Sequence, residues 1–162
     1  ILRDMGAAMS PFNAFMFIQG LETLALRVRE HSKNADEIAK FLMDHPKVER
    51  VVHPSVASDL AKERADKYLS GGCGGLMGFE IKGGIEAGKQ FINSLEMFYH
   101  VANIGDARSL AIHPASTTHS QLNEEELLSA GVTPGYVRLS IGLEHLDDIK
   151  DDLTQALDKV SV

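Results

Sequence analysis

The segment Leu76-Met77-Gly78-Phe79-Glu80-Ile81-Lys82-Gly83-Gly84 indicates the fold class, because a strand pattern gives way there to a helix pattern. Leu76 to Lys82 is typical of a strand, and the two glycines that follow break it. Ile85 to Leu95 then has the spacing of a helix. The same succession recurs on both sides of this segment, so we expect a domain in which strands and helices alternate.

Outward from this segment, short apolar runs and helical periodicities follow one another. The runs predicted as strands are Val48–His53 (ended by Pro54), Ser109–His113 (ended by Pro114) and Tyr136–Ile141. The predicted helices are Asp59–Leu69, a short helix capped by Asn123 with Glu126 in a capping box and ended by Gly131, and a last helix with apolar positions from Leu146 to Val160. This order predicts an α+β fold, with helices covering one face of a mostly antiparallel sheet.

A helical region precedes this domain. Ser10-Pro11 is a strong helix start, and His45-Pro46 supplies a stop. Unbroken, the helix would run about 50 Å, with Gly20 as a candidate bend. We expect residues 1–45 to form a long connecting helix region and residues 46–162 to form one domain. Because the helix is long and the chain opens at Ile1, we also expect a domain separated from a larger body.

Composition narrows the classes of function. The 162 residues carry a formal net charge of -7, which argues against a nucleic-acid surface. No apolar run approaches bilayer-spanning length, so no membrane partner is expected. Cys73 is the single cysteine, which excludes an internal disulfide and favours a reducing, cytoplasmic setting.

Several sequence patterns that are typical of binding or catalytic sites are incomplete in this chain. The glycine-rich stretch Ser70–Gly75 follows a predicted helix and precedes a strand, which is the reverse of a phosphate loop, so we interpret it as a connector. His113 and His119 are too few for a zinc site, and no third ligand is tied to them by spacing. No serine lies in a G-x-S-x-G setting. The sequence therefore predicts neither a metal centre nor a hydrolase triad.

Arg138 is the most informative polar residue. In a strand it shares a face with Tyr136 and Ser140, opposite Val137 and Leu139. An arginine in a sheet needs a partner, because an unpaired buried charge is costly. One possible partner is a protein acid, such as Glu144 or Asp106; the other is the carboxylate of a ligand, which a guanidinium grips with two parallel hydrogen bonds. Residue chemistry alone leaves both interpretations open.

Several motifs, in order along the chain, resemble the C-terminal region of the Cys/Met-metabolism family of pyridoxal-phosphate enzymes. They are Leu2–Gly6, Ser10–Phe15, Gln19–Leu24, Asn103–Leu110, His113–His119 and Val137–Glu144. Within the family the chain looks most like the O-acetylhomoserine sulfhydrylase branch. The other branches, cystathionine γ-synthase, the cystathionine lyases and methionine γ-lyase, usually carry Ser-x-Gly-Gly where this chain has Asn103-Ile104-Gly105-Asp106. The segment Thr117–Leu122 also resembles the sulfhydrylases more than these other branches.

The resemblance implies the smaller C-terminal domain of a fold-type-I, aminotransferase-like enzyme. It implies that Arg138 binds the α-carboxylate of an amino-acid substrate, with Asn103 assisting where relatives use serine and Thr118 close to the same pocket. The implied reaction is a γ-replacement, in which acetate leaves and sulfide or a thiol adds, with pyridoxal phosphate as cofactor. The whole enzyme is expected to be a homotetramer.

The chain departs from the family in one respect that limits its chemistry. None of its nine lysines lies in the Ser/Thr-x-Thr-Lys context of the family's attachment lysine, and the phosphate-binding loop is absent. We therefore expect this chain to carry no catalytic or cofactor-binding residue, to need an N-terminal cofactor domain as partner, and to be inactive alone. The alternatives are a cystathionine γ-synthase or γ-lyase relative, a non-catalytic amino-acid-binding α+β module, or a purely structural domain.

Overall fold

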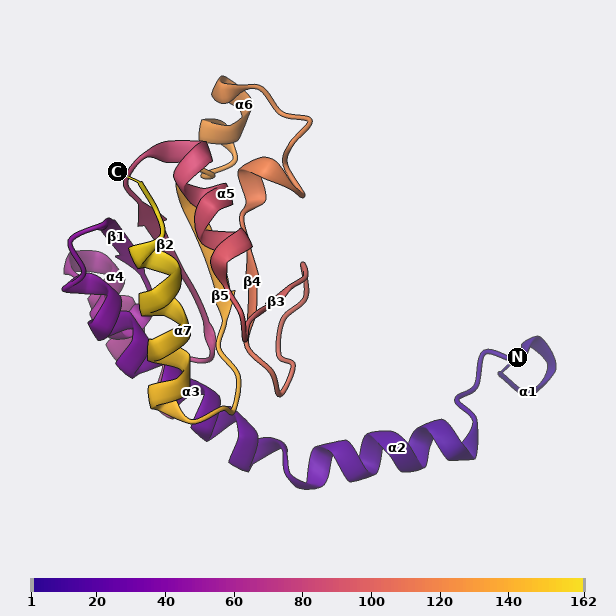
Figure 1. Ribbon diagram of the computed structural model, residues 1–162. Coiled ribbons are helices and arrows are strands. Elements are labelled where there is room, and N and C mark those ends of the chain that lie inside the picture. Colours follow the sequence, from indigo (N-terminus) through magenta and orange to yellow (C-terminus); the bar gives the residue numbers. More distant parts are fainter. Residues whose placement is uncertain (1, 162) are drawn as a thin grey trace.

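The computed structural model describes residues 2–161. A five-stranded sheet and its covering helices make up the body, and the N-terminal helices extend away from it (Figure 1). The helices are α1 (Leu2–Met5), α2 (Pro11–Glu22), α3 (Leu24–Met43), α4 (Asp59–Tyr68), α5 (Gly84–Ser94), α6 (Glu124–Ser129) and α7 (Leu146–Asp158), with short 3-10 turns η1 (Pro54–Val56) and η2 (Pro114–Ser116). The strands are β1 (Val48–Val52), β2 (Leu76–Ile81), β3 (Tyr99–His100), β4 (Leu110–Ile112) and β5 (Tyr136–Ser140).

The sheet is mixed, in the order β1-β2-β5-β4-β3. The first three pairings along this order are antiparallel, and the short β3 runs parallel to β4. The four strands predicted from sequence are confirmed to within one or two residues at each end. β3 was not predicted, because a strand of two residues is too short to show any alternation.

One face of the sheet carries the main core. Met77, Phe79 and Ile81 of β2 and Val137 and Leu139 of β5 point to this face and are at most 2% exposed. They pack against buried side chains of α3, α5 and α7, which are Ala35, Ile38, Ala39, Leu42, Ala87, Phe91, Ile92, Ile149, Leu153, Ala156 and Leu157. Three helices thus cover this face, as predicted. Residues of α3, which come before position 45, share this core with residues of the later strands and helices. The core therefore crosses the boundary that was expected between residues 1–45 and 46–162.

The N-terminal region differs from one long helix. It breaks at Thr23, three residues after the glycine where a bend was expected, and α3 restarts at Leu24. Arg27 secures the break by donating to the Gly20 carbonyl at 2.8 Å and to the Thr23 hydroxyl at 2.6 Å. Arg27 therefore satisfies a carbonyl that the interrupted helix leaves free.

No helix within residues 2–161 has the length and apolarity needed to cross a bilayer.

The ends of α6 and α7 show why the chain forms helices there. Asn123 and Glu126 form the predicted capping box on α6. Lys47, just before β1, donates through Nζ to the carbonyls of Leu157, Asp158 and Val160, at 2.9, 3.1 and 2.9 Å. A cation at the negative end of a helix is favourable, so Lys47 ties the start of β1 to the end of α7.

A buried carboxylate holds the connection between α5 and β3. Asp152 of α7 is 7% exposed, and its oxygens accept from the main-chain N–H groups of Glu96, Met97 and Phe98 at 2.9, 2.9 and 3.2 Å. Gln155 donates to the same carboxylate at 2.8 Å. Charge-assisted bonds to three donors justify the burial of this group. Asp152 therefore fixes the chain as it leaves α5.

We predict that Asp152→Ala lowers the free energy of unfolding by about 2–4 kcal/mol, because three main-chain donors lose their acceptor in a partly buried loop. Urea denaturation followed by circular dichroism measures the change. Asp151→Ala is the matched control, since Asp151 is an exposed neighbour on the same helix, and it should cost less than about 0.5 kcal/mol. Equal losses in the two variants would contradict the role of Asp152.

Candidate functional site

Arg138 lies near the middle of β5, the central strand of the sheet. Its neighbours Val137 and Leu139 are fully buried in the core, so Arg138 points to the opposite face, as the alternation predicted. Tyr136 and Ser140 share this face. Arg138 pairs in register with Gly78 of β2 and Ile112 of β4. Arg138 as a residue is half-buried, and the hydrogen bond that its guanidinium makes lies in an exposed position.

The two acids that could have neutralised Arg138 are bonded elsewhere. Glu144 accepts from the main-chain N–H of Ser109 at 2.6 Å and from the Ser109 hydroxyl at 2.9 Å. Asp106 accepts from the main-chain N–H of Arg108 at 2.9 Å, a contact that, with the nearby guanidinium, lowers the pKa of the Asp106 carboxyl. Within residues 2–161, Arg138 forms no ion pair. The interpretation in which a protein carboxylate compensates Arg138 is therefore not supported.

Arg138 instead contacts the loop that carries Asn103. Its Nη2 donates to the main-chain carbonyl of Asn103 at 3.3 Å. Two residues along β5, the Ser140 hydroxyl accepts from the N–H of Gly105 at 3.0 Å. Gly105 has a φ of +77°, which favours glycine at this turn. The strand and the loop are thus joined at two points, which bring Arg138 next to the main chain of Asn103.

The segment that follows β5 is clasped from two sides. On one side, α3 supplies His31, whose Nδ1 lies 2.6 Å from the Ile141 carbonyl, and Asn34, whose amide donates to the carbonyls of Gly142 and Glu144 at 3.2 and 3.1 Å. On the other side, the Gly142 N–H donates to the Ser109 hydroxyl at 2.9 Å. A Cβ at Gly142 would collide with the Glu144 carboxylate and the Ser109 backbone, so only glycine fits. The clasp holds the end of β5, and with it the position of Arg138.

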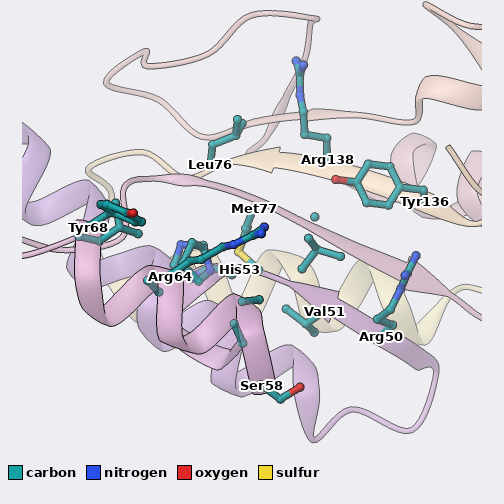
Figure 2. Close-up of a pocket in the computed structure, with 17 residues that line it drawn as sticks. Arg50, Val51, His53, Ser58, Arg64, Tyr68, Leu76, Met77, Tyr136 and Arg138 are labelled. Carbon is teal, nitrogen blue, oxygen red and sulfur yellow. The ribbon is translucent and has the colours of Figure 1, made fainter. Parts of the chain in front are cut away.

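Tyr136 is a residue of the site that the sequence analysis did not assign. Its ring lies over Gly78, where any Cβ would overlap the phenol. Figure 2 shows Tyr136 and Arg138 side by side along β5, on one wall of a cavity of about 920 Å³. Burial raises the pKa of the Tyr136 hydroxyl, and the nearby Arg138 and Arg50 oppose this shift. The phenol is therefore a neutral donor beside the guanidinium.

Thr118 is the third predicted site residue, and its hydrogen bonds are separate from those of Arg138 and Asn103. It follows η2 on an exposed turn, and its hydroxyl is 2.9 Å from Nδ1 of His119. In the part of the chain that the structure describes, no hydrogen bond links it to Arg138 or Asn103. Its approach to a substrate carboxylate stays a prediction.

The remaining polar residues that the sequence analysis weighed have structural partners. His113 is 1% exposed, with Nδ1 at 2.8 Å from the Ser116 hydroxyl and Nε2 at 2.8 Å from the Pro134 carbonyl. Burial lowers the pKa of His113 and raises that of the Cys73 thiol, so the histidine is neutral and the cysteine is a weak nucleophile. Among residues 2–161, no three His, Cys, Asp or Glu side chains gather as metal ligands would.

None of the nine lysines lines the cavity, and each has a partner elsewhere. Their ammonium groups lie against an acid, a main-chain carbonyl or an aromatic ring: Lys33 with Glu30, Lys40 with Glu37, Lys47 with the end of α7, Lys62 with Asp66, Lys67 with Tyr68, Lys82 with Pro46, Lys89 with Glu86, Lys150 with Phe41 and Lys159 with Glu96. The site therefore fits an anion-binding wall but does not fit covalent attachment of an aldehyde cofactor through a lysine of this chain.

The chain is similar to known proteins over almost its whole length. The chain is 57% identical over 160 residues to the O-acetyl-L-homoserine sulfhydrylase of Leptospira meyeri, covering 98% of this chain and 36% of the relative. It is 43% identical to an L-methionine gamma-lyase of Fusobacterium nucleatum, covering 98% of this chain and 40% of the relative. A crystal structure of a putative O-acetylhomoserine (thiol)-lyase from Campylobacter jejuni, which holds a pyridoxyl-lysine monophosphate at position 205, superposes with a TM-score of 0.87 at 47% identity, covering 97% of this chain and 37% of that chain.

These coverages show that the chain spans little more than a third of the length of these relatives. The family model for Cys/Met metabolism PLP-dependent enzymes matches residues 1–158, almost the entire chain. That match agrees with the resemblance found in the motifs around Asn103, His113 and Arg138. The chain belongs to the Cys/Met metabolism family of pyridoxal-phosphate-dependent enzymes.

Proposed function

We propose that this chain is the substrate-binding C-terminal part of a pyridoxal-phosphate-dependent O-acetylhomoserine sulfhydrylase with the fold-type-I architecture. The observation that carries the proposal is Arg138, a half-buried residue on the open face of the sheet whose guanidinium pairs with no carboxylate among the described side chains. Such a charge is stabilised when an anion arrives, and a planar carboxylate matches its geometry with two parallel hydrogen bonds. The ligand proposed is the α-carboxylate of an amino-acid substrate.

Asn103 completes the grip from the neighbouring loop. Its Oδ1 accepts from the Ile104 N–H at 2.9 Å, so the amide NH2 group is proposed as the donor to the substrate. Its carbonyl holds Arg138, so the same residue orients the guanidinium and presents a donor beside it. Thr118 joins the pocket in this proposal only if its turn approaches the substrate. These residues orient the substrate and take no part in bond making.

The cofactor is proposed to be held by the part of the protein that the relatives have and this chain lacks. Pyridoxal phosphate, when bound there, supplies an electron sink for carbanions next to the amino group. The lysines of this chain are placed for other contacts, so attachment and proton transfer by lysine are assigned to the N-terminal part. This chain supplies one wall, which positions the substrate carboxylate, and the whole enzyme is proposed to be a homotetramer in the cytoplasm.

Two activities are compared for the whole protein, that of a sulfhydrylase and that of a γ-lyase. The relatives include both sulfhydrylases and an L-methionine gamma-lyase, but identity is higher to the sulfhydrylase, at 57% against 43%. Asn103-Ile104-Gly105-Asp106, in place of Ser-x-Gly-Gly, also favours the sulfhydrylase. The proposed reaction is therefore replacement of the acetoxy group of O-acetylhomoserine by sulfide or a thiol, with acetate as the leaving group. A sulfhydrylase consumes sulfide, whereas a lyase releases a thiol from methionine.

We predict that co-expression with the cofactor domain of a sulfhydrylase of this family restores homocysteine formation from O-acetylhomoserine and sulfide. In that assembly Arg138→Ala should raise KM at least about 30-fold, equivalent to about 2 kcal/mol of charge-paired binding, with a smaller rise for Arg138→Lys. Lys89→Ala removes a surface cation of α5 and is the control. Formation of homocysteine with an unchanged KM in Arg138→Ala would refute the carboxylate assignment, and assembly without any activity would refute the sulfhydrylase.

Asn103 gives a second prediction, because its side-chain donor and its main-chain acceptor can be separated. Asn103→Asp keeps the shape and the carbonyl contact but replaces a donor with a negative charge beside the substrate carboxylate. We expect KM to rise about tenfold or more, since one charge-assisted bond is worth about 1.5–3 kcal/mol. Asn103→Ser restores a donor and should stay within about threefold of the parent. Similar KM values for the Asp and Ser variants would place the side chain outside the pocket.

A further inference from the structure

The cavity beside Arg138 continues under α4, away from the Asn103 loop. Its walls there are β1, β2 and the inner side of α4 (Figure 2). No residue of α4 is buried, although the helix lies beside the sheet. Ala57, Ala61 and Ala65, spaced four apart, line the helix side of the cavity. These small side chains leave open the space that larger apolar residues would fill.

The size of this space fits a small molecule. The whole cavity, of which the α4 end is one part and the Arg138 end another, has a volume of about 920 Å³, and ligand sites usually measure roughly 300–1,000 Å³. The walls are largely apolar, with Val51, Val52, Leu69, Leu76 and Met77 among the residues that line them. Two phenols, Tyr68 and Tyr136, add aromatic surface. An occupant would therefore bury an apolar body.

The charged groups around the cavity all have one sign. Three arginines line it, from β1, α4 and β5, and no acidic residue does. Arg50 pairs with Glu80 at 3.1 Å and is thereby partly neutralised. Arg64 forms no hydrogen bond or ion pair with any residue of the described part of the chain. Arg64 is exposed, and Figure 2 shows its side chain extending from α4 toward the strands, so it is the cation of this end without a partner in the described part of the chain.

The α4 end is distinct from the Arg138 end. Arg138, Gly78 and Val52 are neighbours across β5, β2 and β1, which separates the outer two backbones by about 10 Å at the usual strand spacing. The Arg138 guanidinium is drawn to the Asn103 carbonyl. In Figure 2 the side chains of Arg64 and Arg138 point in different directions. One small carboxylate would meet one of these arginines at a time.

We propose that the space between α4 and strands β1 and β2 is a second anion site, held by Arg64 with Arg50, for small carboxylates that have an apolar body and no ammonium group. At the α4 end of the cavity no acid of the described residues is within the lining, so an ammonium group placed there would find no ionic partner. Branched 2-oxo acids have the matching chemistry. The site stands on its own residues and does not depend on the proposed function of Arg138.

Isothermal titration calorimetry of this chain with 4-methyl-2-oxopentanoate tests the site. Leucine is the comparison probe, because it has the same carbon skeleton with an ammonium group where the oxo acid has its oxo group. We expect saturable binding of the oxo acid and at least tenfold weaker binding of leucine. Arg64→Gln should weaken oxo-acid binding at least tenfold, and Ala61→Phe should do so by filling the space without a change in charge. Arg29→Gln, which removes an exposed arginine of α3, should leave it unchanged. Circular dichroism checks that each variant is folded.

Arg138→Gln separates this inference from the proposed function. Oxo-acid binding should stay within threefold of the parent in that variant. Loss of binding in Arg138→Gln with retention in Arg64→Gln would show that the probe occupies the substrate pocket, and would overturn the second site while leaving the carboxylate role of Arg138 intact. Leucine binding as tight as that of the oxo acid would also overturn the second site. So would the absence of saturable heat with up to about 10 mM oxo acid, roughly the weakest affinity that still has meaning for a small ligand.

Discussion

The position of Arg138 on the central strand, on the face opposite the core, connects most features of the molecule. Arg138 stands between two fully buried neighbours, so the strand cannot turn it toward the opposite, solvent-free face without disrupting the core. The acids within reach along the chain are already bonded, Glu144 to Ser109 and Asp106 to Arg108. The neutral carbonyl of Asn103 orients the charge without cancelling it. These contacts leave Arg138 without an acid partner among the described side chains, which is the basis of the proposed carboxylate site.

The surroundings of Arg138 are arranged to hold it in place. His31 and Asn34 of α3 and Ser109 before β4 all bond to the turn that follows β5. Ser140 and Arg138 itself bond to the loop that carries Asn103. These contacts join residues that are up to 110 positions apart in sequence. Binding sites need such supporting contacts, because a guanidinium that moves freely loses the benefit of its geometry.

The N-terminal helix α2 explains why the chain is interpreted as part of a larger assembly. It has no buried residue, and Phe12, Phe15, Met16, Phe17, Ile18 and Leu21 are each 54–69% exposed. These residues surround the helix on all sides, which is typical of a helix enclosed by protein. The chain spans little more than a third of its relatives. The extended arm in Figure 1 and the short coverage thus agree with the proposed cofactor domain.

The sequence by itself determined the elements and the direction in which Arg138 points. Strand alternation and capping chemistry are local properties, so β1, β2, β4, β5, the capping box of α6 and the face shared by Tyr136 and Arg138 could all be predicted. Family motifs identified Arg138 and Asn103 together, although no local rule joins residues 35 positions apart.

Only the tertiary structure decided which partners the charged groups have. Whether Glu144 compensates Arg138 or bonds to Ser109, and whether Asp152 is exposed or accepts from three main-chain donors, depends on elements that meet far apart in sequence. The break at Thr23 was also beyond local reasoning, because Arg27 stabilises it from the next turn. The cavity under α4 depends on small residues of a helix facing a strand. Sequence periodicity encodes which side of an element is apolar, but partners follow from packing in three dimensions.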